Sequence, residues 1–181
     1  MVTDHGRLTF SGNRELTCPT GSGWDARMGT EIERKFLVDG DDWRQGSGSR
    51  HVRQGYLSAD PDRSVRIRVV GDDAWLTIKG ASAGCRRLEF QYPIPTQDAL
   101  HLLDELCIHP VIDKTRHDVR YGAHRWEIDE FHGANEGLVI AEIELDSETE
   151  AFERPPWLAA EVSDDPRYYN VNLARRPFSR W

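Results

Sequence analysis

Apolar and polar residues alternate along most of the chain from residue 30 onward, as expected for β-strands that bury one face. The segment EIERKFLV at residues 31–38 shows this alternation clearly. The pattern predicts strands at 30–38, 51–58, 63–70, 73–79, 85–93, 111–120, 123–131 and 138–146. The segments GDD at 71–73 and YGAH at 121–124 are typical of tight hairpin turns. These features predict a mainly antiparallel β-fold.

Two segments have helical patterns. TQDALHLLDELC at 96–107 has apolar residues at helical spacing, with Thr96 as a candidate N-cap. Asp165 followed by Pro166 predicts the start of a second helix over 166–175. Residues 1–28 contain scattered Gly and Pro without a clear period, so we expect a disordered N-terminal extension before a single domain at 29–181. The fold class is therefore α+β, with β-structure dominant.

The polar face of the predicted strands carries an unusual number of charged side chains. At this parity lie Glu31, Glu33, Lys35, Arg53, Arg66, Arg68, Lys79, Arg87, Glu89, Lys114, Arg116, Glu127, Asp129, Glu142 and Glu144. A solvent-exposed face of an antiparallel sheet is one interpretation. The other is an eight-stranded barrel with a charged interior, which would need an anionic ligand and a divalent cation to balance its charges. The pattern alone leaves both open.

Composition restricts the possible partners. The chain has 181 residues and a formal net charge of −8, which argues against non-specific binding to nucleic acid. We find no apolar run near the roughly 18 residues of a membrane span, and no signal peptide. The three cysteines show neither disulfide nor metal-binding spacing. We therefore expect a cytoplasmic protein that binds neither nucleic acid nor membranes and is a monomer or homodimer.

The ordered set of charged strands resembles the CYTH family, also called triphosphate tunnel metalloenzymes. The resemblance rests on E-x-E-x-K at 31–35 and on RQGYL at 53–57, VRIRV at 65–69, LTIKG at 76–80, RLEF at 87–90, DKTRH at 113–117, WEIDEF at 126–131, AEIEL at 141–145, PPWL at 155–158 and DPRYYNVNLA at 165–174. It implies an eight-stranded antiparallel closed barrel, the tunnel, with helices packed on its outside. The chain is most similar to the short bacterial members, although Asp113 stands where Glu is expected.

The resemblance also implies roles for individual residues. Glu31, Glu33, Asp129, Glu142 and Glu144 would bind Mg²⁺ or Mn²⁺, and Lys114 would act on the attacking water. The phosphates would be bound by Lys35, Arg53, Arg66, Arg68, Lys79, Arg87 and Arg116. For each charged residue, an ion pair within the barrel is the structural alternative. Residues 165–176 are expected either near one tunnel mouth or against the barrel exterior.

The implied activity is metal-dependent hydrolysis of inorganic triphosphate, which makes a small anion the expected partner. Class IV adenylyl cyclase and thiamine triphosphatase are the alternatives within the family, because their substrates also carry a triphosphate. A module that binds triphosphate, polyphosphate or nucleoside triphosphate without turnover is an alternative of a different class.

Overall fold

The computed structural model describes residues 32–44, 48–83 and 86–181, which form an antiparallel sheet of nine strands. The strand order is β5-β4-β3-β2-β6-β7-β8-β1-β9. The strands are β1 (Ile32–Val38), β2 (Gly48–Ser58), β3 (Arg63–Val70), β4 (Asp73–Ala83), β5 (Arg86–Pro93), β6 (Ile112–Tyr121), β7 (His124–Phe131), β8 (Val139–Leu145) and β9 (Leu158–Glu161). The predicted N-terminal extension, residues 1–28, lies outside the described residues.

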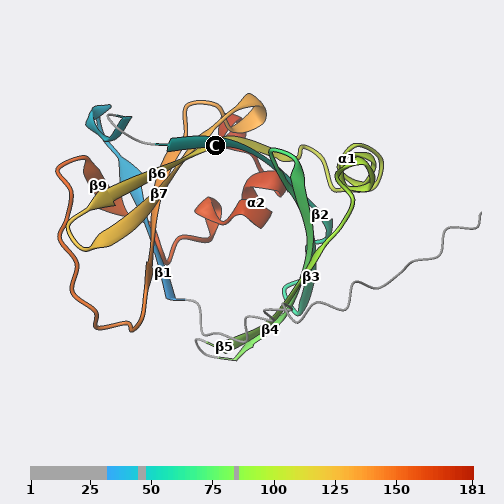
Figure 1. The fold of residues 1–181 in the computed structure, drawn as a ribbon, viewed down its shortest axis with the longest axis horizontal. Helices are drawn as coiled ribbons and strands as arrows, with labels where there is room; N and C mark the ends of the chain where they lie inside the picture. The colour runs from blue at the N-terminus through green and yellow to red at the C-terminus, as the bar shows by residue number, and fades with distance from the viewer. Residues whose placement is uncertain (1–31, 45–47, 84–85) are drawn as a thin grey trace, which may run out of the picture.

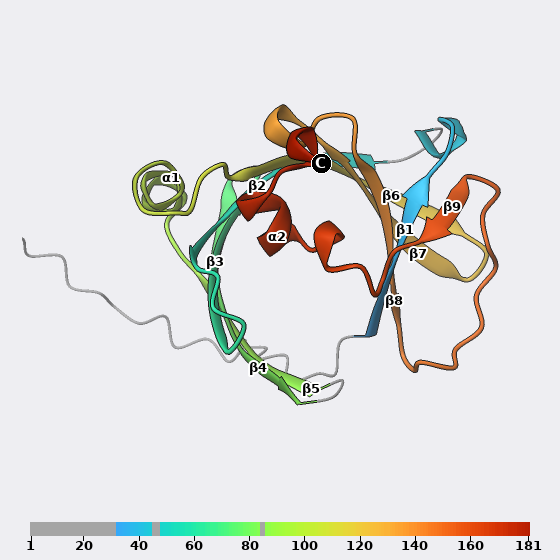
Figure 2. The ribbon, with the colours of Figure 1, turned by 180° about the vertical axis from the view of Figure 1, so that it is seen from behind.

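The sheet curves around a central space, so that it has a concave and a convex face (Figures 1 and 2). The α-helices are α1 (Thr96–Glu105) and α2 (Asn170–Arg175). Short 3₁₀ turns lie at Asp42–Arg44, Gly133–Asn135, Pro166–Tyr168 and Phe178–Arg180. Within the described part of the chain, neither helix has the length and apolar composition needed to span a membrane.

The prediction of a mainly antiparallel β-fold is confirmed, with two differences in detail. The short strand β9 pairs with β1 and gives the sheet nine strands instead of the expected eight. Among the described residues, no pairing joins the edge strands β5 and β9.

The convex face holds most of the apolar core. Phe36, Trp126 and Ile143 pack there in one buried cluster, together with Trp43. Helix α1 covers the other half of this face, where Leu103 packs among residues of β3 and β4. The alternation of apolar residues along the strands therefore supplies the outer layer of the fold, as the sequence predicts.

Helix α2 packs on the opposite, concave face. Its residues Leu173 and Ala174 are buried against Ile112 of β6, Phe131 of β7 and Ile140 of β8. Each of these three strand residues lies two positions from a charged residue of the concave face, so its side chain points to the same face. Figure 2 shows α2 inside the curve of the sheet, so the expectation that all helices pack outside is wrong for α2. The segment that carries α2 therefore covers part of the concave face.

The predicted local signals are mostly confirmed. Gly71 and Gly122 have φ values of 58°, which fits the two predicted hairpin turns. Asp165 caps the 3₁₀ turn at Pro166–Tyr168 by accepting a hydrogen bond from the backbone N–H of Arg167. Thr96 is wrong as the N-cap, because Pro95 takes that position and the Thr96 hydroxyl donates to the carbonyl of Asp72.

Helix α1 approaches β2 closely at Gly55, and we predict that Gly55→Ala destabilises the protein. A Cβ added there would lie 2.8 Å from Cys107 Cβ and 3.0 Å from Leu103 Cδ2. Such overpacking should reduce the free energy of unfolding by about 1–3 kcal/mol, measured by urea denaturation. Gly48→Ala is the control, because nothing lies within 4 Å of its added Cβ. Equal unfolding midpoints for the two variants would contradict the proposed close contact.

Candidate functional site

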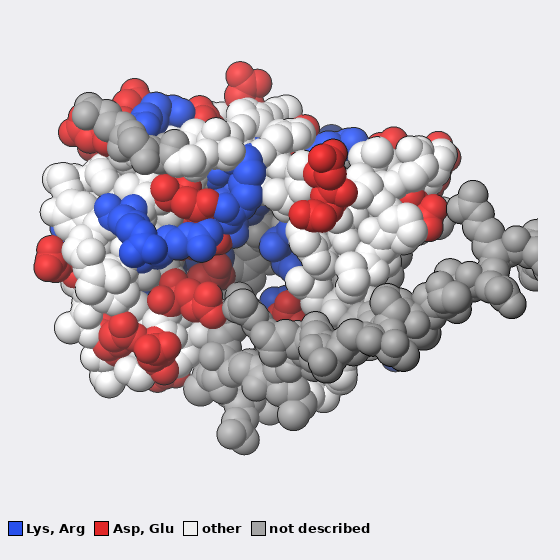
Figure 3. Space-filling view, viewed as in Figure 1, with Lys and Arg blue, Asp and Glu red and all other residues white. Residues whose placement is uncertain are grey.

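The strand register brings most of the predicted site residues to the concave face. Lys35 of β1 lies opposite Glu142 of β8, and Arg116 of β6 lies opposite Asp129 of β7. Figure 3 shows Lys and Arg side chains along the hollow that opens on the viewed face, with Asp and Glu beside them. The predicted site residues at this parity are Glu33, Lys35, Arg66, Arg68, Lys79, Lys114, Arg116, Asp129, Glu142 and Glu144.

Buried ion pairs cross the strands β6, β7 and β8. The guanidinium of Arg116 donates to both carboxylate oxygens of Asp129 at 2.6 Å, in a bidentate arrangement. It also donates to Glu142 at 2.7 Å and is paired with Glu127. Burial opposes ionisation of Asp129, but Lys114 and Arg116 outweigh it and hold the Asp129 pKa below its usual value. Asp129 is therefore an ionised carboxylate shared by two cations.

The same network continues into β1 through Lys35. Its ammonium donates to Glu33 at 2.6 Å and is also paired with Glu142. Burial disfavours the charged form, yet Glu142 and Glu33 raise the Lys35 pKa above its usual value. Lys35 therefore joins the carboxylates of neighbouring strands by carrying a fixed positive charge.

Lys114 is the most deeply buried cation of the site, with a side chain that is 0% exposed. It is paired with Asp129, and its Nζ lies 5.5 Å from the centre of the Phe131 ring. Burial, reinforced by Arg116, lowers the Lys114 pKa to about 8. The structure thus holds an ammonium in a dry, strongly polar setting of the kind that is common at catalytic centres.

Arg66 and Arg68, which are half-buried, differ from the buried cations, because within the described residues neither forms an ion pair. Arg66 donates to the Thr77 hydroxyl and Arg68 to the Gln54 side-chain carbonyl, both at 3.3 Å. Burial, reinforced by Arg66 and Arg116, lowers the Arg68 pKa to about 10. Two neighbouring guanidinium groups with neutral partners form a cationic site that an anion would complete.

Arg66, Arg68 and the neighbouring Gln54 form one wall of the concave face. Two buried donors on this wall have no acceptor among the described residues. They are Nε of Arg66 and Nε2 of Gln54, a side chain that is 0% exposed. A buried donor without a partner costs about 1–3 kcal/mol, so such groups point to a missing acceptor. The oxygens of a bound anion would satisfy both.

Glu33 and Glu144 form the part of the site best suited to a metal ion. They lie directly opposite each other on β1 and β8, and both are exposed. Carboxylates at directly opposite cross-strand positions repel each other unless a cation lies beside them, and here the ammonium of Lys35 already contacts Glu33. The third predicted ligand, Glu31, lies outside the described residues. Among the residues the structure describes, no three acidic, His or Cys side chains meet in a metal-binding cluster.

Asp129 and Glu142 are less suited to the predicted metal-binding role. Their oxygens accept from Lys114, Arg116 and Lys35, so a metal ion would have to displace these cations. The two carboxylates instead fit the structural alternative, in which they hold the basic residues of the site in place.

The prediction that Arg53 faces the site is wrong. In the register of β2, Val52 and Gln54 lie on the concave face, so Arg53 points to the convex face. There it forms a 3.0 Å ion pair with Asp104 of α1. Lys79 lies on the concave face and is paired with Glu89 at 2.8 Å. The side chain of Arg87 lies outside the described part of the structure.

Three residues on the concave face of β2 were missed in the sequence. Arg50 lies opposite Arg116 and is paired with Asp118 and Glu127. Tyr56 is buried, and burial raises its pKa, while Arg66 and Arg68 act against that rise. Gln54 is described above. The signal available in the sequence was that these three residues are separated by even numbers of positions along β2, so their side chains point to one face. Arg53 lies at an odd distance from each of them.

Comparisons with known proteins identify the class that this fold and site define. The model of the CYTH domain matches residues 29–176, so the chain belongs to the CYTH family. An inorganic triphosphatase of Acetivibrio thermocellus is 48% identical over 154 residues, covering 85% of this chain and 99% of that protein. An inorganic triphosphatase of Nitrosomonas europaea is 34% identical over 152 residues, covering 80% of this chain and 97% of that protein.

The fold comparison agrees with the family assignment. A crystal structure of an inorganic triphosphatase aligns with a TM-score of 0.61 and 32% sequence identity. The alignment covers 81% of this chain and 95% of the other.

We predict that Asp129→Asn destabilises the protein strongly, because it leaves Lys114 and Arg116 with less compensation for their buried charges. The free energy of unfolding should fall by about 3 kcal/mol or more in urea denaturation without phosphate ligands. Asp104→Asn is the matched control, since this carboxylate is 56% exposed, and it should change stability by less than about 0.5 kcal/mol. A loss for Asp129→Asn as small as that of the control would show that the network is not energetically important.

Proposed function

We propose that this protein hydrolyses inorganic triphosphate to diphosphate and phosphate on the concave face of its sheet, with Mg²⁺ or Mn²⁺ as the cofactor. The observation that carries the proposal is the wall of Arg66, Arg68 and Gln54, where, among the described residues, buried donors lack acceptors and two cations lack carboxylate partners. A linear triphosphate supplies many acceptor oxygens and a high negative charge. The relatives described above, which are named inorganic triphosphatases, support the same substrate.

In this proposal Arg66 and Arg68 bind the phosphate oxygens. A guanidinium can donate two parallel hydrogen bonds to a phosphate, which fixes the orientation of the chain of phosphates as well as its position. Lys35 and Arg116, which are paired with carboxylates, lie on the same concave face and add positive potential. Substrate binding would thus satisfy groups that have no partner in the described part of the chain.

Glu33, Glu144 and Glu31 are the residues that would hold the divalent metal ion. Their carboxylate oxygens are the ligands that Mg²⁺ and Mn²⁺ prefer, which fits the facing pair on β1 and β8. The bound metal ion would neutralise phosphate charge and stabilise the phosphoryl group during its transfer.

Lys114 would orient the attacking water. Its buried ammonium is held by Asp129 beside Phe131, so it has one preferred position. The water oxygen forms a bond to a terminal phosphorus, the bond from that phosphorus to the bridging oxygen of diphosphate breaks, and the proton that the water loses passes to the departing diphosphate or to solvent. An ammonium in this position can donate a hydrogen bond to the water or to the phosphate that is attacked.

The direct test of the proposed function is phosphate release from inorganic triphosphate, with Mg²⁺, with Mn²⁺ and with a chelator. We expect release with metal and none with the chelator. Arg68→Ala should raise KM about tenfold or more, because a charged hydrogen-bond donor is lost. Arg53→Ala, the matched control on the convex face, should leave KM within about twofold of wild type. Absence of metal-dependent release would contradict the proposal, and equal effects of the two variants would contradict the placement of the substrate.

A second prediction concerns Lys114. Lys114→Met removes the charge but keeps much of the side-chain volume, and it should lower kcat by roughly 100-fold. The affinity for imidotriphosphate, a triphosphate analogue that resists hydrolysis, should change far less. Steady-state kinetics and calorimetric titration measure the two quantities separately. An equal loss in kcat and in affinity would make Lys114 a simple phosphate contact and exclude the role in orienting water.

A further inference from the structure

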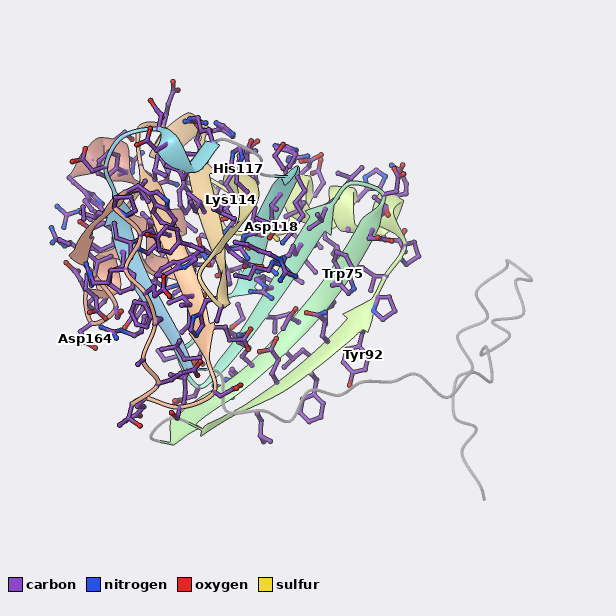
Figure 4. The ribbon with its side chains drawn as sticks, turned by 60° about the vertical axis from the view of Figure 1, so that its left-hand side comes forward. Trp75, Tyr92, Lys114, His117, Asp118 and Asp164 are labelled. Atoms are coloured by element: carbon purple, nitrogen blue, oxygen red, sulfur yellow. The ribbon has the colours of Figure 1, made fainter. Side chains whose placement is uncertain are left out.

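The segment at residues 166–181 forms a pocket of its own. The volume of this pocket is about 230 Å³, and its lining residues are Pro166, Arg167, Asn172, Arg175, Arg176 and Trp181. None of these residues belongs to a strand of the sheet. Figure 4 shows Lys114 among the strands and Asp164, just before the segment, at the outer edge of the molecule. No residue of the site described above lines this pocket.

Helix α2 lies between the pocket and the strands β6, β7 and β8. Its residues Leu173 and Ala174 are buried against those strands. Asn172, Arg175 and the C-cap residue Arg176 have the i, i+3, i+4 spacing of a single helix face, and both arginines are exposed. One side of α2 therefore supplies apolar contacts to the sheet, and the other side supplies polar groups to the pocket.

The pocket brings together three guanidinium groups, of which only one has a carboxylate partner among the described residues. Arg167 is paired with Asp165. Arg175 donates to the backbone carbonyl of Ala59 at 2.9 Å and forms no ion pair in the described part of the chain. The same holds for the guanidinium of Arg176, which directly follows Arg175. Two adjacent cations without a carboxylate would be stabilised by an anion.

An aromatic wall gives the pocket a defined shape. The ring of Trp181 makes edge-to-face contacts with Tyr168 and Phe178, each with ring centres 5.1 Å apart. Its indole N–H donates to the backbone carbonyl of Arg176 at 3.1 Å, and the guanidinium of Arg167 lies 5.2 Å from its ring centre. Because these contacts already order the wall, less side-chain entropy would be lost when a ligand binds.

We propose that this pocket binds a small phosphate anion, either inorganic phosphate or diphosphate. Guanidinium groups donate paired hydrogen bonds to phosphate oxygens. A tetrahedral phosphate offers oxygens in several directions, which suits Arg167, Arg175 and Arg176 better than the two oxygens of a carboxylate do. The pocket is smaller than the roughly 300–1,000 Å³ of drug-sized ligand sites, which also favours a small ion. The inference does not rest on the proposed function, although both products of that reaction belong to this ligand class.

The test is nuclear magnetic resonance of the indole N–H groups while the full chain is titrated with inorganic phosphate, without metal. Trp181→Phe identifies the signal of Trp181, which we expect to shift in a saturable manner. Arg176→Gln should weaken the affinity read from this signal about tenfold, because a charged donor is lost. Arg180→Gln is the matched control, since this exposed arginine does not line the pocket, and it should leave the affinity within about twofold.

Arg68→Ala separates this pocket from the proposed phosphate site on the concave face. The Trp181 signal should respond to phosphate in Arg68→Ala as it does in wild type. No saturable shift, an equal response to acetate at the same ionic strength, or equal affinities of Arg176→Gln and wild type would each exclude the pocket. A response lost in Arg68→Ala but kept in Arg176→Gln would assign the binding to the concave face instead. Thermal unfolding of each variant shows that a lost affinity does not reflect a lost fold.

Discussion

The structure depends on the buried ion pairs that join β6, β7, β8 and β1 across the concave face. Lys35, Lys114, Arg116, Asp129 and Glu142 are each at most 8% exposed, and each has an oppositely charged neighbour on an adjacent strand. Leaving one of these charges without its partner would be costly. Because a one-residue slip would turn the charged side chains toward the apolar convex face, the same pairs specify the register of the strands.

The two halves of the concave face have different charge balance, and this difference links the fold to the proposed chemistry. On β6, β7, β8 and β1 the cations are matched by carboxylates, whereas Arg66 and Arg68 on β3 have neutral partners among the described residues. A ligand that bridges the halves would place its negative charge on the arginines and its metal ion near Glu33 and Glu144. The protein thus supplies one wall whose charges are paired and, in the proposed function, one wall that the ligand completes.

The alternation of residues predicted most of the sheet and most of the charged face, because a period of two is set by local backbone geometry. It failed at β2, where polar residues lie on both faces and only the pairing with β6 shows that Gln54 faces inward and Arg53 outward. The position of α2 could not be predicted either. Apolar residues such as Phe131 and Ile140 lie on the same strand face as the charged residues, and only the three-dimensional structure shows that they pack against α2. Likewise, the sequence alone could not show that Asp129 is engaged by Lys114 and Arg116.

The most direct test of the central claim is a crystal structure of the protein with imidotriphosphate and Mg²⁺. We predict that phosphate oxygens accept hydrogen bonds from Nε of Arg66 and Nε2 of Gln54, two buried donors of the concave face that lack acceptors among the described residues. The metal ion should lie between the carboxylates of Glu33 and Glu144. A ligand bound away from the concave face, with both donors still unsatisfied, would contradict the account.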